Sequence, residues 1–115
     1  MRAIDLRSRR CTACTPNTPK LSADQIREHL GALDGWSLVE GGGAIVRELR
    51  FPDYYQTMAF VNAVAYIAHS EDHHPDLEVS YNRCRVRYST HAIGGLSDND
   101  FICAAKVDGL VAEAR

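Results

Sequence analysis

LEVSYNRCRVRY, residues 77–88, is the stretch that decides the fold. Apolar side chains alternate with polar ones through both of its halves; the apolar positions are Leu77, Val79, Tyr81, Cys84, Val86 and Tyr88. Such alternation is typical of strands that bury one face and expose the other. The stretch therefore predicts two neighbouring strands. Between the apolar positions of the second strand stand Arg83, Arg85 and Arg87, which we expect to keep an exposed sheet face soluble rather than to bind phosphate or nucleic acid.

A second pair of strands is predicted upstream. Residues 36–40 and 44–51 both have strand character, and the run Gly41-Gly42-Gly43 stands between them. A short glycine turn between two such segments favours an antiparallel hairpin.

Three helices are predicted from their start signals. Ser22-Ala23-Asp24-Gln25 has the form of a capping box and begins a helix that continues to about Leu33. Pro52 and Asp53 precede a long periodic stretch, residues 54–72, which Pro75 should end near His73 and His74. Ser97 is the expected N-cap of the last helix. The order of these elements predicts an α+β fold, a four-stranded antiparallel sheet with three helices packed on one face.

Length and charge place these elements in one globular domain. The chain has 115 residues and a formal net charge of −2, which gives no electrostatic case for a nucleic-acid partner. Residues 1–20 lack apolar periodicity and are expected to be a poorly ordered N-terminal tail, so the domain is expected to span residues 21–115. No stretch is apolar for long enough to cross a membrane, and Met1 to Lys20 lacks the apolar middle of a secretory signal. We therefore expect a cytoplasmic protein.

Four cysteines are present, and only Cys11 and Cys14 have a suggestive spacing. A C-x-x-C pair is compatible with zinc binding or with redox chemistry. A structural zinc ion usually has four ligands, however, and Cys84 and Cys103 are better explained as core residues. We therefore expect no metal site from the cysteines.

Residues 69–100 hold four of the five histidines, together with several acids. The unperturbed pKa of histidine lies near neutrality, so histidines beside carboxylates can donate and accept protons around one small molecule. The cluster therefore indicates a proton-transfer site, with solvated surface histidines at a helix end as the alternative. A metal site is a further alternative, because His69 and His73 are four positions apart and His91 or Asp100 could complete a ligand shell.

This region resembles the pterin-4a-carbinolamine dehydratases, which in animals are also dimerisation cofactors of a homeodomain transcription factor. The matching segments are His73-His74-Pro75, Tyr81-Asn82, Ser89-Thr90-His91, Gly95-Leu96-Ser97 and Asp100. Three residues separate His69 from His73, five separate Pro75 from Tyr81, nine separate Tyr81 from His91, and eight separate His91 from Asp100. The predicted order of elements also agrees with that family, from about Leu21 to Val111.

The resemblance implies a hydro-lyase that dehydrates 4a-hydroxytetrahydrobiopterin to the quinonoid dihydropterin, and so recycles the pterin cofactor of aromatic amino-acid hydroxylases. It implies catalytic roles for His73, His74 and His91, with Asp100 as the residue that orients His91. It implies that the substrate is bound by His69, Pro75, Ser89 and Thr90. No cofactor and no metal are expected for this reaction, and the expected partners are a reduced pterin and, functionally, a hydroxylase.

The same resemblance leaves a second kind of function open, that of a non-catalytic dimerisation or regulatory binding module. Self-association is expected from the sequence itself, because the apolar residues of the helix predicted over residues 54–72 cover more than one face. A helix buried deep in the core is the alternative explanation for that pattern. We expect a homodimer or a homotetramer.

Overall fold

The computed structural model describes residues 6–113 and confirms the predicted α+β class. Within that range, three long helices accompany a four-stranded sheet. In chain order the elements are α2 (Ala23–Gly31), β1 (Ser37–Leu38), β2 (Ile45–Arg50), α3 (Tyr54–Glu71), β3 (Asp76–Ser80), β4 (Arg83–Tyr88), the 3-10 helix η1 (His91–Ile93) and α4 (Asp98–Glu113). No helix of the described range is both long and apolar enough to span a membrane.

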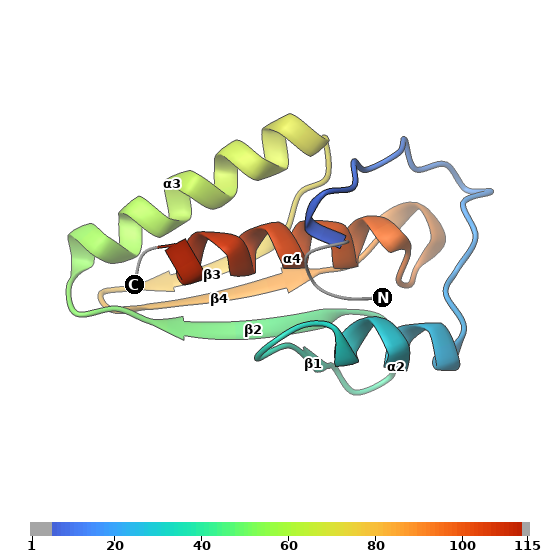
Figure 1. The fold of residues 1–115 in the computed structure, drawn as a ribbon, viewed down its shortest axis with the longest axis horizontal. Coiled ribbons are helices and arrows are strands. Elements are labelled where there is room, and N and C mark those ends of the chain that lie inside the picture. The colour runs from blue at the N-terminus through green and yellow to red at the C-terminus, as the bar shows by residue number, and fades with distance from the viewer. Residues whose placement is uncertain (1–5, 114–115) are drawn as a thin grey trace.

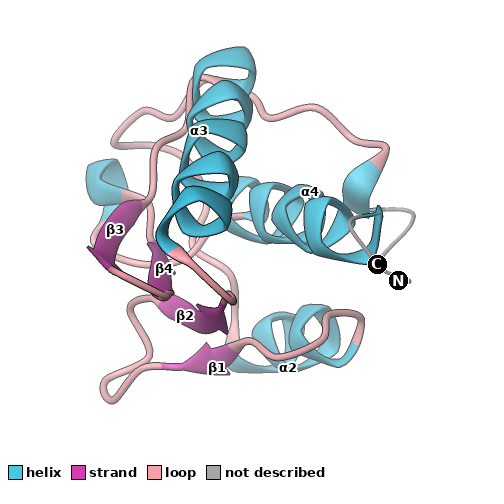
Figure 2. Ribbon diagram, turned by 90° about the vertical axis from the view of Figure 1, so that its left-hand side faces the viewer, coloured by secondary structure: helices cyan, strands magenta, loops and turns pink. Residues whose placement is uncertain are grey.

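The sheet has the strand order β1-β2-β4-β3, and every neighbouring pair is antiparallel. Figure 2 shows α2, α3 and α4 on the same side of this sheet. The register places Tyr88 opposite Ile45 and Cys84 opposite Leu49, and all four of these side chains are buried. The predicted alternation along residues 77–88 thus gives β4 a buried face beneath the helices, while the edge strand β3 stays more exposed.

The opposite face of the sheet carries charged side chains that form ion pairs between neighbouring strands. Arg83 contacts Glu48 across β2 and β4, Arg85 contacts Glu78 of β3 at 2.9 Å, and Arg87 contacts Asp76. Each arginine of β4 therefore has an acid on a neighbouring strand. The pairs leave little uncompensated positive charge there, as expected of a solubilising face rather than a phosphate-binding one.

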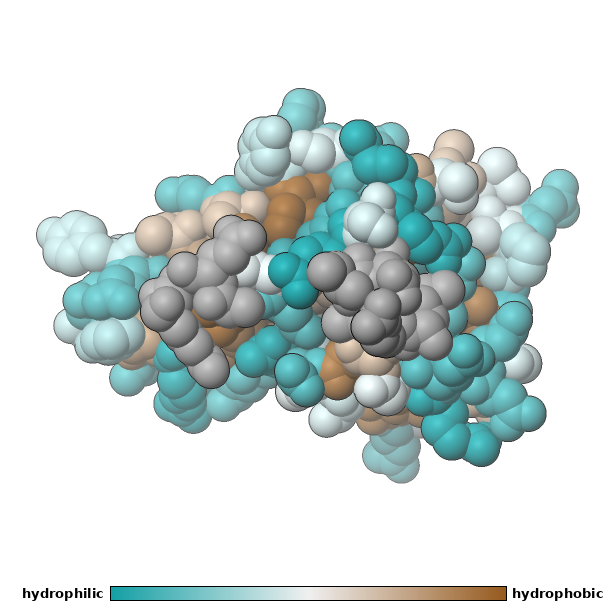
Figure 3. Space-filling model, in the orientation of Figure 1, coloured by the Kyte–Doolittle hydropathy of each residue, from teal (hydrophilic) through white to brown (hydrophobic). Residues whose placement is uncertain are grey.

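A single hydrophobic core lies between the sheet and the helices. Helix α4 is buried on most of its sides in its first half, including Phe101, Ile102 and Ala105. Helix α3 buries one side only: Phe60, Val64 and Ile67 face the core, while Tyr66 is 72% exposed. On the side drawn in Figure 3, hydrophilic residues cover most of the surface and hydrophobic ones show in separate patches.

The predicted helix starts are confirmed at α2. The hydroxyl of Ser22 accepts from the Gln25 N–H at 3.2 Å, and the Gln25 side chain accepts from the Ser22 N–H at 2.8 Å. The two bonds satisfy amide groups that have no partner inside the helix, which fixes where α2 begins. At α3, Asp53 accepts from the Gln56 N–H in the same way.

The segment of residues 6–20, for which we predicted poor order, lies against α3 and α4 (Figure 1). Leu6 is fully buried in the core. The Cys11 N–H donates to the Glu71 carboxylate at 2.8 Å, and the Asn99 side chain both accepts from the Thr12 N–H and donates to the Thr12 carbonyl. We call residues 6–20 the strap. Residues 1–5 of the predicted tail lie outside the described residues, and the domain boundary at residue 20 stays a prediction.

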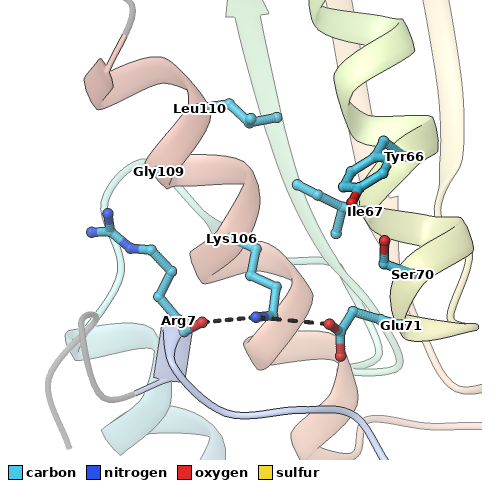
Figure 4. Close-up of a pocket in the computed structure, with 8 residues that line it drawn as sticks. All are labelled: Arg7, Tyr66, Ile67, Ser70, Glu71, Lys106, Gly109 and Leu110. Carbon is cyan, nitrogen blue, oxygen red and sulfur yellow. Dashed lines mark hydrogen bonds and ion pairs between the residues drawn. The ribbon is translucent and has the colours of Figure 1, made fainter.

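A cavity of about 310 Å³ separates the strap, α3 and α4 near the middle of α4. Figure 4 shows the Lys106 ammonium group between the Arg7 carbonyl and the Glu71 carboxylate, at 2.8 Å and 3.8 Å respectively. Burial favours the neutral form of Glu71, but the Cys11 N–H, Lys106 and Arg10 outweigh that effect, so the pKa of Glu71 is lowered. The strap is therefore held to both helices by charged hydrogen bonds.

A half-buried carboxylate, that of Asp108, joins α4 to the sheet. Asp108 accepts from the Trp36 indole N–H at 2.7 Å and from the Arg47 guanidinium group. Burial raises the pKa of Asp108, although the bonds from Trp36 and Arg47 act in the opposite direction. Gly35 has a φ of 80°, and a Cβ atom there would lie 2.8 Å from Arg47 Nε, so only glycine leaves room for this arginine.

Candidate active site

Asp100 is the centre of a buried polar network at the start of α4. Its side chain is fully buried, and its Oδ2 accepts from the Ser97 N–H at 3.0 Å and from the Thr90 hydroxyl at 2.7 Å. Ser97 directly precedes α4, so Asp100 satisfies an amide at the helix start. The two bonds fix the carboxylate in one orientation.

The other carboxylate oxygen of Asp100 contacts a histidine. His73 Nε2 lies 2.6 Å from Asp100 Oδ1, and the His73 side chain is 9% exposed. An ionised carboxylate can only accept hydrogen bonds, so Nε2 is the donor and Nδ1 is the ring nitrogen left for exchange with a substrate. The His73 ring also stacks on Tyr88 at an interplanar angle of 7°. Asp100 and Tyr88 together hold the imidazole in place.

The end of α3 directs His73 inward. Asp72 follows the helix with a φ of 51°, in the left-handed region, and the His73 N–H then donates back to the Ala68 carbonyl at 3.2 Å. This bond satisfies a carbonyl at the helix end. His73 is buried as a result, whereas His74, the next residue, is exposed. The predicted end of this helix near His73 and His74 is confirmed, but neither histidine lies on the helix itself.

A hydroxyl pair extends the network into the loop before α4. The Thr90 and Ser97 hydroxyl oxygens are 2.7 Å apart, and both residues are buried. Because the Thr90 proton points to Asp100, the Ser97 hydroxyl donates to Thr90. Backbone bonds between Thr90 and Gly95 close the loop that contains His91. Strand β4 ends at Tyr88, and His91 begins η1.

A separate cavity of about 220 Å³ brings together three other predicted site residues. His69 at the end of α3, the exposed His74, and Pro75 line it, with Leu77 of β3 and apolar residues of α3. The cavity is mostly apolar and has two imidazoles in its lining, a composition typical of small-molecule sites.

The predicted site residues therefore form two groups, and two further residues lie next to one of them in the chain. His73, Thr90 and Asp100 share the buried network, and His69, His74 and Pro75 share the cavity. Ser89 and the exposed His91 flank Thr90 in the chain. One expectation differs from the structure: the Asp100 carboxylate contacts His73, not His91, because His73 turns inward after α3.

The metal alternative finds no support in this arrangement. Across residues 6–113, no group of three or more His, Cys, Asp or Glu residues is arranged to hold a metal ion. His69 is exposed on α3, whereas His73 lies beyond the helix end and is buried. The two imidazoles therefore do not share the helical face on which that alternative depended.

Comparison with known proteins agrees with the histidine motif. Residues 19–110 match the family model described as pterin 4 alpha carbinolamine dehydratase. The chain belongs to this dehydratase family. A protein of Nitrosospira multiformis is 57% identical over 106 residues, which cover 92% of both chains, and one of Stenotrophomonas maltophilia is 56% identical over 107 residues, 93% of this chain and 92% of that one. Both carry the name pterin-4-alpha-carbinolamine dehydratase as a provisional assignment.

Solved structures of the family have the same fold. A crystal structure from Brucella melitensis, described as a transcriptional coactivator/pterin dehydratase, superposes with a TM-score of 0.77 at 35% identity and covers 80% of this chain and 98% of that one. A pterin dehydratase-like protein described as a RuBisCO assembly factor in the alpha-carboxysome gives a TM-score of 0.59 at 22% identity, covering 66% and 88%. The second likeness shows the fold alone.

Two residues of this dehydratase-family site were not among the predicted site residues. Ser97 was expected only as an N-cap, yet its hydroxyl bonds Thr90. Tyr88 was expected only in the core, yet it stacks on His73, and burial, followed by the nearby Cys103, Cys11 and Asp100, raises its pKa far above the usual range. Its alternation with Val86 signalled burial, but nothing in the sequence indicated its histidine neighbour.

Proposed function

We propose that this protein dehydrates pterin-4a-carbinolamine, 4a-hydroxytetrahydrobiopterin, to the quinonoid dihydropterin and water. The observation that carries the proposal is the buried contact between His73 and Asp100, in a chain of the pterin carbinolamine dehydratase family. A histidine held by a carboxylate has a fixed ring orientation, which helps proton transfer. The reaction would recycle the pterin cofactor of an aromatic amino-acid hydroxylase.

The dehydration needs two proton movements. The bond between C4a and the hydroxyl oxygen breaks when that oxygen receives a proton, and the C4a=N5 double bond forms as the proton on N5 is removed. We assign these steps to His73 and His91, one as acid and one as base. His74, exposed at the rim of the cavity, binds the ring and has access to the same protons. The chemistry requires only proton donors and acceptors, so we propose no metal and no cofactor.

The other predicted residues take supporting roles in this proposal. His69 and Pro75 line the cavity against the pterin ring, and Ser89 lies beside the network at the end of β4. Thr90 is 1% exposed and donates to Asp100, so it acts on the substrate through Asp100 and His73 rather than by direct contact. Asp100 positions His73 in the same sense.

The proposal is tested by stopped-flow kinetics on chemically generated 4a-carbinolamine. Decay of its ultraviolet signal should accelerate in proportion to the concentration of purified protein. A protein that leaves the uncatalysed decay unchanged, at concentrations where it is folded by circular dichroism, would remove the proposed activity. The matched reagent control is the heat-unfolded protein at the same concentration.

We further propose that the protein acts as a homodimer or homotetramer in the cytoplasm. Tyr66 on the outer side of α3 is 72% exposed, and Val79 on the edge strand β3 is 42% exposed. Large exposed apolar groups on a helix and on a strand edge favour contact between subunits. Light scattering at micromolar concentration should return a multiple of the 12.8 kDa chain mass, and a monomer mass would contradict the proposal.

A second candidate function is regulatory binding. It is favoured by the Brucella melitensis relative, which is described as a transcriptional coactivator as well as a pterin dehydratase. A binding module would act without the histidines. If this candidate were the function, His73→Ala would still capture the same partner in a pull-down, while carbinolamine decay would be unaffected by the wild-type protein.

A further inference from the structure

Two thiols from distant parts of the chain meet beneath the strap. Cys11 Sγ lies 3.5 Å from Cys103 Sγ, although the residues are 92 positions apart. Cys103 is fully buried in α4, whereas Cys11 is partly exposed. Both are free thiols in the structure. A disulfide would need the two sulfurs to approach by about 1.5 Å, a movement within reach of a surface segment.

The contacts of the pair define which sulfur reacts first. The Cys11 thiol lies 3.7 Å from the Asn99 carbonyl, to which it can donate, and the Cys103 thiol is then the donor to Cys11 Sγ. That hydrogen bond and burial raise the pKa of Cys103 far above its usual range. Cys103 therefore stays protonated and shielded, and Cys11 is the sulfur that an oxidant can reach.

Cys11 is also held in position by its backbone. Its N–H donates to Glu71 at 2.8 Å, and the neighbouring Thr12 is bonded twice to the Asn99 side chain. Asn99 and Cys103 stand one helical turn apart on α4, so both anchor points lie on the same stretch of helix. The strap thus presents the Cys11 sulfur to Cys103.

We propose that Cys11 and Cys103 form an oxidation site, at which a hydroperoxide converts the two thiols into a disulfide that ties the strap to α4. In the first step Cys11 loses its proton and its sulfur attacks hydrogen peroxide; an S–O bond forms, the O–O bond breaks, and the departing hydroxide takes up the Cys11 proton, which leaves a sulfenic acid and water. Cys103 then passes its proton to the sulfenic oxygen as its sulfur attacks the Cys11 sulfur; the S–S bond forms, the S–O bond breaks, and the oxygen leaves as water. Two thiols lose two electrons, and one peroxide is reduced to two waters.

The C-x-x-C spacing points to a different pair, Cys11 with Cys14, and the structure separates the two choices. The Cys14 sulfur accepts from the Asn99 side-chain amide at 3.0 Å, and the Thr12 carbonyl is 4.0 Å from it. Cys11 instead has its sulfur contact with Cys103. Cys14 is partly exposed on the same strap, which makes Cys14→Ser a matched control for Cys11→Ser.

The linkage can be read from tryptic peptides of the full chain after treatment with hydrogen peroxide and alkylation without reductant. Cleavage after arginine and lysine places Cys11 and Cys14 together in residues 11–20, and Cys103 in residues 88–106. We expect a species that joins these two peptides, 2 Da lighter than their sum, which dithiothreitol separates. Cys14→Ser should still give the joined species, and Cys11→Ser should not.

A thermal readout tests the consequence for the strap. A disulfide between residues so far apart restricts the unfolded chain strongly, so peroxide should raise the Tm of the wild type and of Cys14→Ser on the order of 10 °C. The Tm of Cys11→Ser should not rise. A disulfide within residues 11–20, disulfide-linked dimers as the main product, or full alkylation of Cys11 after oxidation would each overturn the proposal.

Discussion

Helix α4 holds two hydrogen-bonded aspartates with different roles, the fully buried Asp100 and the half-buried Asp108. Asp108 accepts from Arg47, a side chain that is always charged, and from the Trp36 indole. Asp100 accepts from His73, a side chain that can gain or lose a proton, and from Thr90 and the Ser97 amide. Each carboxylate accepts at least two hydrogen bonds from the residues packed around α4. They differ in whether the partner can change its charge.

This difference distinguishes a structural contact, that of Asp108, from a potentially reactive one, that of Asp100. The pair of Asp108 with Arg47 has one stable charge state, so it can only fasten α4 to the sheet. The partner of Asp100 is an imidazole, which, unlike a guanidinium group, can both donate and accept a proton. A shielded, hydrogen-bonded carboxylate is therefore no sign of function by itself, because Asp108 and Asp100 both have one; the chemistry of the partner side chain makes the difference.

The largest effect is expected on the dehydration rate, when a proposed catalytic histidine is replaced. His73→Ala or His91→Ala should lower kcat/KM for carbinolamine dehydration on the order of 10²- to 10⁴-fold, because each removes a proposed general acid or base. Stopped-flow dehydration rates measure the effect, and circular dichroism checks the fold.

The control for these variants is His69→Ala, which removes an exposed imidazole of the cavity and should cost less than either. The double variant His73→Ala with His91→Ala should lose less than the product of the single losses if both histidines act in one step. Wild-type rates in both single variants would refute the assignment of this site.

Replacing Asp108 should instead lower the stability of the fold and leave the dehydration rate unchanged. Asp108→Ala leaves the Arg47 guanidinium group, 17% exposed, without its carboxylate, and should lower the free energy of unfolding by about 3 kcal/mol. Urea denaturation measures it. The kcat/KM of the folded variant should match that of the wild type, and a rate loss as large as that of His73→Ala would erase the distinction between the two aspartates.

The Glu71 carboxylate is a third case, because its contribution to the stability of the fold depends on pH. Its folded pKa is lowered from an ordinary value of 4.5, so it stabilises the fold above that pH and loses this contribution as the pH falls through and below it. Glu71→Gln should therefore be less stable than the wild type by about 1 kcal/mol at pH 7. The two stability curves should converge below pH 4.5. A gap that stays constant down to pH 3 would contradict the charge-based role.

The smallest effect is expected where the carboxylate is open to solvent. Glu78, 65% exposed, pairs with Arg85 at 2.9 Å on the charged sheet face. Arg85→Ala should change the free energy of unfolding by less than about 1 kcal/mol, since exposed ion pairs contribute little. Denaturation in low and high salt tests this, and a loss comparable to that of Asp108→Ala would show that burial does not rank these pairs.

Local signals predicted most of the fold. The capping box at Ser22 and Gln25, the alternation along residues 77–88 and the break imposed by Pro75 each depend on neighbouring residues, and the structure has the helices and strands that they predict. The first hairpin is shorter than predicted, because β1 consists only of Ser37 and Leu38.

What the sequence did not reveal depends on contacts between distant residues. Leu6 stands among arginines and shows no periodicity, yet it is fully buried in the hydrophobic core. Asp100 was expected to orient His91, but its carboxylate contacts His73, because the backbone turn after α3 buries that residue, and nothing in the sequence signalled this turn. The cysteine spacing pointed within the strap, whereas the close sulfur pair crosses from the strap to α4.

Asp72 is the one residue other than glycine, among those described, with a positive φ. Its left-handed backbone turns the chain at the end of α3; His73, which follows it, is buried, and the next residue, His74, is exposed. The range of amino acids that position 72 can accept follows from this geometry. Asparagine and glycine adopt a φ near 51° at little cost, whereas valine or isoleucine would resist it. The choice of residue at position 72 is therefore limited by the backbone turn that places His73 in the interior.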